Sequence, residues 1–111
     1  MKKHLLALCI FSAYLNPANA VFFSSADLYQ WLDNDLHDIE TYQGGMAKGY
    51  LMGVLDMLSS KTPPIICPPS GISVLKLKMV VYDYILTTPD AKNQRVDKLV
   101  YQAFVKTWSC Q

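Results

Sequence analysis

The sequence is poor in the residues on which catalytic and metal sites depend. Its 111 residues include two histidines and three cysteines, and His37 is the only histidine after residue 20. The acidic stretch from Asp33 to Glu40 lacks the glycine and the twelve-residue frame of a calcium loop. A dyad of Cys67 and His37 would require Cys67 to be a free thiolate. We therefore expect no enzymatic activity, no metal and no cofactor.

An excess of positive charge and a long hydrophobic run are also missing. Ten Lys and Arg residues stand against nine Asp and Glu residues, which gives no basis for nucleic-acid binding. The longest apolar run, 5–15, falls well short of the roughly 20 residues that a membrane-spanning helix needs. It follows Lys2 and Lys3 and precedes the small residues of 16–20, a pattern typical of a secretory signal peptide. We expect residues 1–20 to be removed, leaving a periplasmic chain without a membrane anchor.

Two cysteines, Cys67 and Cys110, remain in the mature chain 21–111. An even pair in an exported protein predicts a disulfide. The mature chain forms one small domain with a limited core, so we expect such a bridge to be important for its stability. The loop-entropy model predicts that the bridge stabilises the folded state by roughly 4 kcal/mol.

Four segments of the mature chain have helical periodicity. Ser24 or Ser25 caps a helix over 26–32, which we expect to end before Asp33. A third helix is predicted over 74–87 with Ser73 as its cap, and a fourth from Asp90 or Asn93 to residue 108. The apolar faces predicted for these last two are Leu77, Val80, Val81, Tyr84 and Ile85, and then Val96, Leu99, Val100, Ala103, Phe104 and Trp108.

The second helix is predicted over 39–59. Its expected apolar stripe is Ile39, Tyr42, Met46, Tyr50, Val54, Met57 and Leu58. Gly45, Gly49 and Gly53 recur at every fourth position, which predicts close packing of another helix, either within the domain or across a dimer.

The segment 61–70 breaks the helical pattern. Pro63, Pro64, Pro68 and Pro69 exclude both a helix and a central strand and make a stiff loop. We predict that Ile65, Ile66, Pro68 and Pro69 bind a partner, because a loop ordered in advance loses less entropy on binding.

Several motifs follow one another in the second half of the chain. They are GYLMGVLDML at 49–58, Ile66-Cys67-Pro68-Pro69-x-Gly71-Ile72-Ser73, the segment 77–89 ending in Pro89, and Leu99-Val100 followed by Trp108-Ser109-Cys110. This ordered set resembles the Rap/Tai family of immunity proteins. The resemblance implies a small exported, all-helical and often dimeric protein that binds and inhibits a peptidoglycan amidase toxin delivered by type VI secretion. It also implies pairing of Cys67 with Cys110.

The chain departs from that family at two positions. Members commonly have a second cysteine pair where this sequence has Leu32 and Ala47. Since both cysteines are missing together, we expect the fold to be retained, with a weaker hold on the first helix.

The sequence thus predicts a small single-domain, all-α bundle of four to five helices stapled by one disulfide. A Rap/Tai-like immunity domain over 21–111 is expected to occlude the active site of a type VI amidase effector and to form a homodimer. The alternative is an acid-activated periplasmic chaperone of the HdeA type, whose carboxylates would act as the switch. A structural subunit of an envelope complex is a third interpretation.

Overall fold

The computed structural model describes residues 21–110, and within this range its regular elements are helices. They are α2 (Ser25–Leu36), α3 (Tyr42–Ser59), α4 (Val74–Thr87), the short 3-10 helix η1 (Ala91–Asn93) and α5 (Val96–Trp108). The predicted all-α bundle is therefore confirmed. The predicted signal peptide, 1–20, lies outside the described residues. No helix in the described range is long and apolar enough to cross a bilayer.

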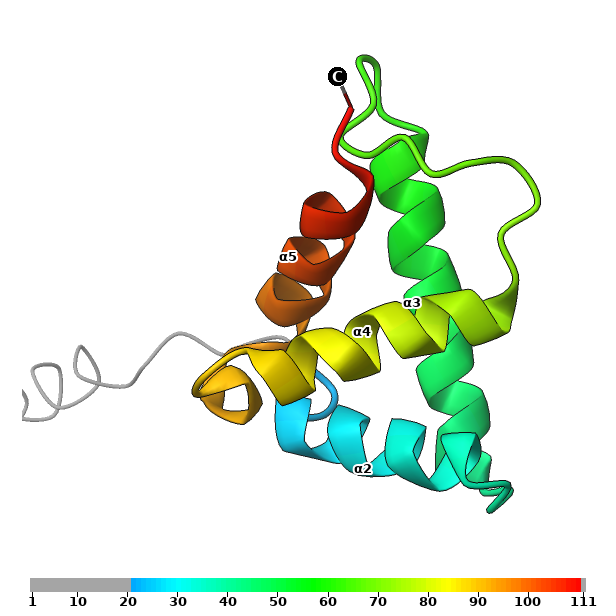
Figure 1. Cartoon of the computed structure of the whole chain (residues 1–111), viewed down its shortest axis with the longest axis vertical. Coiled ribbons are helices and arrows are strands. Elements are labelled where there is room, and N and C mark those ends of the chain that lie inside the picture. Colours follow the sequence, from blue (N-terminus) through cyan, green and yellow to red (C-terminus); the bar gives the residue numbers. More distant parts are fainter. Residues whose placement is uncertain (1–20, 111) are drawn as a thin grey trace, which may run out of the picture.

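The helices cross one another around a shared core (Figure 1). Helix α2 contacts α3, α4, α5 and η1, while α4 also packs on α3 and α5. The connection between α3 and α4 lies beside the C-terminal end of α5, at the opposite end of α3 from the α2–α3 turn (Figure 1). The fold therefore has one end made by the proline-rich loop and another made by the α2–α3 turn.

Hydroxyl side chains cap the N-termini of α2, α3 and α4. Ser24, Thr41 and Ser73 each accept a hydrogen bond from the backbone N–H three residues later, at 3.0, 2.9 and 3.1 Å. These caps satisfy donors that a helix cannot pair within itself. The predicted caps Ser24 and Ser73 are confirmed, and α4 has the predicted bounds.

Other predicted helix boundaries are wrong. Helix α2 continues through 33–35 to Leu36, and α3 begins at Tyr42 because Asp38 adopts a left-handed conformation (φ 60°) and Thr41 supplies the cap. Asp90 also has a positive φ (59°) and precedes η1, so α5 starts only at Val96.

The core receives side chains from all four α-helices, the largest number of them from α5. All six residues predicted for the apolar face of α5 are buried, and Leu77, Val81 and Ile85 of α4 are buried as predicted. From α2, the core receives Leu28 and Leu32.

The predicted apolar stripe of α3 is only partly correct. The buried residues of α3 are Gly44, Ala47, Leu51 and Leu58. Of the predicted stripe, Leu58 is buried, and Tyr50 and Val54 are partly buried against the core. The outward face instead presents Ile39 just before the helix, then Tyr42, Met46 and Met57, all of them exposed. The error arose because apolar residues and glycines occupy nearly every position of α3, so its sequence has two apolar faces.

Candidate functional site

The loop between α3 and α4 is fixed to the ends of two helices. The Ile65 N–H donates to the Leu58 carbonyl at 3.0 Å, and the Cys67 N–H donates to the Trp108 carbonyl at 2.8 Å. An isolated antiparallel bridge also pairs Ile66 with Ser109. The backbone of 65–67 is therefore anchored both to the last turn of α3 and to the chain that follows α5.

A disulfide closes the same junction. Cys67 and Cys110 are bonded, with their Cα atoms 5.0 Å apart. The predicted bridge is thus confirmed. Because Cys67 is in a disulfide, it cannot act as the thiolate of a dyad with His37, which lies beyond α2 at the other end of α3.

The four residues predicted to bind a partner differ in accessibility. Ile65 is 38% exposed and Pro69 is exposed, while Pro68 is half-buried. Ile66, in contrast, is 0% exposed and belongs to the core. The expectation that both isoleucines are surface residues is wrong for Ile66, because the backbone bridge to Ser109 places its side chain on the core side of the loop. Ile66 therefore anchors the loop to the core. Partner contact stays a prediction for Ile65, Pro68 and Pro69.

Beside this loop lies a recess that the sequence did not predict. Its volume is about 310 Å³, and it is bounded by α3, the loop and the first turn of α4. The residues that define it include Met52, Asp56, Pro68, Pro69, Ile72 and Leu77. Asp56 is the only charged residue among those lining it, and it is also the only acidic residue of α3. That isolated charge within an apolar motif was the one available signal in the sequence.

The backbone at Gly71 shapes one wall of the recess. Gly71 has φ 76°, a left-handed conformation that glycine adopts without a Cβ clash. This turn directs the chain from the prolines into Ser73, whose hydroxyl caps α4. The loop and the start of α4 are therefore joined by a defined turn.

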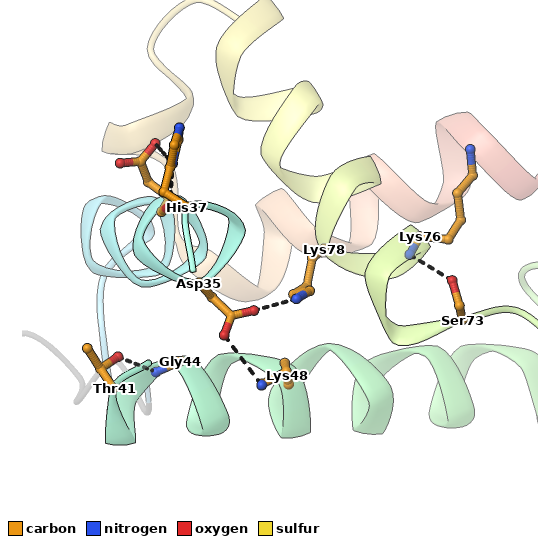
Figure 2. A network of polar contacts seen from close by, with 9 residues as sticks. Asp35, His37, Thr41, Gly44, Lys48, Ser73, Lys76 and Lys78 are labelled. Carbon is orange, nitrogen blue, oxygen red and sulfur yellow. Dashed lines mark hydrogen bonds and ion pairs between the residues drawn. The ribbon is translucent and has the colours of Figure 1, made fainter. Parts of the chain in front are cut away.

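A polar cluster at the opposite end of α3 joins three helices. The Asp35 carboxylate of α2 accepts a hydrogen bond from the Lys78 ammonium of α4 and is paired with Lys48 of α3 at 3.4 Å (Figure 2). Lys78 and then Lys48 hold the pKa of Asp35 below its usual range, although burial acts in the opposite direction. Gly44 lies close by, since a Cβ there would come within 3.3 Å of an Asp35 carboxylate oxygen.

A second carboxylate, Asp33, holds α2 against α4. The Tyr82 hydroxyl donates to Asp33 Oδ1 at 2.6 Å, and this hydrogen bond raises the pKa of Tyr82. The Tyr82 ring stacks on that of Tyr29 with centroids 5.4 Å apart. His37 Nδ1 lies 3.5 Å from Asp33 Oδ1. These contacts explain why the acidic end of α2 remains helical.

The two ends of α3 therefore differ in chemistry. One end holds ion pairs and hydrogen bonds that are satisfied within the chain. The other presents a rigid loop with an exposed isoleucine, prolines and an apolar recess. Within residues 21–110, no group of three or more His, Cys, Asp or Glu side chains could hold a metal ion. The loop end is suited to binding another macromolecule.

The family model described as Rap1a immunity proteins matches residues 3–110. No curated protein matches the chain.

Proposed function

Since the chain belongs to the family of Rap1a immunity proteins, we propose that it binds and inhibits a peptidoglycan amidase effector of a type VI secretion system. Membership of the family makes it an immunity protein that acts against a secreted toxin. The proposal adds the chemistry of the toxin, the mode of inhibition and the compartment. Inhibition would occur by occlusion of the amidase active site, without chemistry by the chain itself.

The observation that supports occlusion is the anchored loop. Two backbone hydrogen bonds, the bridge at Ile66 and the disulfide fix residues 65–67, while the Ile65 side chain stays exposed. A loop held in this way keeps its shape on binding and loses little conformational entropy. An exposed apolar side chain on a rigid support is the kind of anchor that can enter an enzyme cleft.

The compartment is part of the proposal. The N-terminal pattern over residues 1–20 is typical of export, and disulfides such as Cys67–Cys110 persist in oxidising compartments. A periplasmic immunity protein would meet its amidase where peptidoglycan is exposed.

We also propose a homodimer. The predicted packing of Gly45, Gly49 and Gly53 within the domain is wrong, because a Cβ at any of them would have no atom within 4 Å. These glycines lie on the outward face of α3 beside Met46 and Met57, both exposed. A second copy of the chain is the occupant that we propose for this face.

The test is capture of the toxin from periplasmic extract. The tagged mature chain, 21–111, is purified at neutral pH with a high-salt wash, and bound proteins are identified by mass spectrometry. We expect one stoichiometric peptidoglycan amidase. Many unrelated clients that appear only after acidification would instead support the chaperone of the HdeA type, and the immunity proposal would be abandoned.

A further inference from the structure

The recess beside the loop combines apolar walls with a single carboxylate. Leu55, Ile72 and Leu77 contribute to the walls, and Asp56 is the one charged residue among those lining it. Asp56 is exposed, and none of the hydrogen bonds or ion pairs within residues 21–110 involves its carboxylate. The recess therefore has an acceptor of two or more hydrogen bonds that the chain itself does not use.

The same molecule shows how such a carboxylate is satisfied when a lysine is within reach. Asp35, which lies where α2, α3 and α4 meet, is paired with Lys78 and Lys48. No Lys, Arg or His is among the residues lining the recess at Asp56. The residues that line the recess supply no cation for Asp56, so its exposed carboxylate is open to a basic group of another molecule.

From this we infer that the recess receives a lysine or arginine side chain of the toxin, with its cationic head on Asp56; this inference rests on the proposed function. A long basic side chain matches the recess because its aliphatic stem covers apolar walls while its charged head reaches an anion. A purely apolar side chain would strip water from Asp56 without replacing its hydrogen bonds, which costs free energy. The volume of about 310 Å³ lies at the lower end of the range for ligand pockets and suits one side chain better than a larger ligand.

The position of the recess makes this contact useful to inhibition. Pro68 and Pro69 line the recess and also belong to the loop that we propose to enter the amidase cleft. A basic side chain bound at Asp56 would therefore lie next to the inserted loop and fix its orientation. Apolar surroundings strengthen such a charge pair relative to one in open water.

The first arm of the test needs no amidase. The 13C-methyl resonances of Met52 and Ile72 are followed while the mature chain is titrated with Nα-acetyl-lysine methylamide or with its uncharged counterpart, Nα-acetyl-norleucine methylamide. We expect the lysine compound to shift these resonances more than the norleucine compound, and Asp56→Asn to abolish the difference. Equal shifts from the two compounds, or no shift from either at tens of millimolar, would overturn the inference.

The second arm uses the amidase that the capture experiment returns, purified in inactive form. Asp56→Asn is expected to weaken its binding about tenfold or more, because one partner of a desolvated charge pair is lost. The matched control is Asp83→Asn, which removes an exposed carboxylate of α4 that does not line the recess, and it should change affinity by less than about twofold. If wild type binds and Asp56→Asn binds equally well, the inference fails while the proposed function stands. If wild type binds no amidase, the proposed function fails and the toxin contact with it.

Discussion

Among single residues, the adjacent Ile65 and Ile66 have different expected roles, the first in binding a partner and the second in stabilising the fold. Ile65 is exposed on the loop, whereas Ile66 lies in the core. We predict that Ile65→Asp leaves the fold intact and weakens amidase binding by at least about tenfold, as expected of an anchor residue. Ile66→Asp should instead lower the free energy of unfolding by about 3 kcal/mol or more, because it buries an unpaired charge. Urea unfolding and calorimetric titration check the pair, and full binding by Ile65→Asp would exclude the loop as the inserted element.

Asp35 is the residue whose loss should most affect the joint between α2, α3 and α4. Its side chain is 9% exposed and that of its partner Lys78 is 13% exposed. Asp35→Asn leaves this lysine without a counter-ion, so we predict a loss of about 3 kcal/mol in unfolding free energy. Urea unfolding at pH 7 measures the loss, with Asp83→Asn as the control, for which a change below about 0.5 kcal/mol is expected. Equal effects of the two variants would show that the ion pairs of Asp35 contribute no net stability.

The lowered pKa of Asp35 also determines the pH range in which this residue stabilises the fold. The folded-state pKa lies below the unfolded value of about 3.9, so the contribution of Asp35 is complete above pH 4 and is lost as the pH falls through its folded pKa. We predict that wild type and Asp35→Asn differ in unfolding free energy at pH 7 and converge as the pH falls through the folded-state pKa of Asp35. A wild-type tertiary near-ultraviolet circular dichroism signal that is already lost at pH 5 would contradict this and favour the acid-activated chaperone.

At the scale of helices, the sequence pattern predicted the elements better than it predicted the face of α3. In helix α5, charged residues such as Asp97 and Lys98 lie on one face and apolar residues on the other. Only the apolar face can be buried, and the face predicted from the sequence is correct. Helix α3 contains only Lys48 and Asp56 as charged residues. Its buried face is chosen by contacts with α2, α4 and α5, which are tertiary contacts that local periodicity does not encode.

The outward glycines of α3 give a prediction for the element. Gly49 is exposed within the helix, and a Cβ there would meet no atom within 4 Å. Gly49→Ala should therefore raise the free energy of unfolding of the single chain by about 0.5–1 kcal/mol, since alanine restricts the unfolded chain and favours helix. Thermal unfolding at low and high protein concentration measures this. A decrease that appears only at high concentration would indicate a second copy packed on this face, and a decrease at every concentration would contradict the prediction.

At the scale of the whole molecule, the sequence predicted the parts of the site that depend on local chemistry. Proline positions predicted the stiff loop, and the pair Cys67 and Cys110 predicted the bridge, which the structure confirms. The burial of Ile66 could not be predicted, because it depends on pairing with Ser109 after α5. The recess at Asp56 was missed for the same reason, since its walls come from α3, the loop and α4.

The disulfide links the loop to the C-terminal end of the chain across 43 residues. Closing a loop of that length restricts the unfolded chain and is worth roughly 4 kcal/mol in the loop-entropy model. We predict that reduction lowers the melting temperature by several degrees or more, measured by circular dichroism with and without reductant. A Cys67→Ser and Cys110→Ser double variant that loses no stability would show that the backbone contacts of the loop suffice.

We propose that this chain inhibits an amidase by covering its active site. The most direct measurement titrates the mature chain, 21–111, into the captured amidase while the release of soluble fragments from purified peptidoglycan is followed. We expect activity to fall linearly to zero at one chain per amidase active site, and Ile65→Asp to shift the titration to higher concentration. A stable complex that retains full amidase activity would exclude inhibition by active-site occlusion.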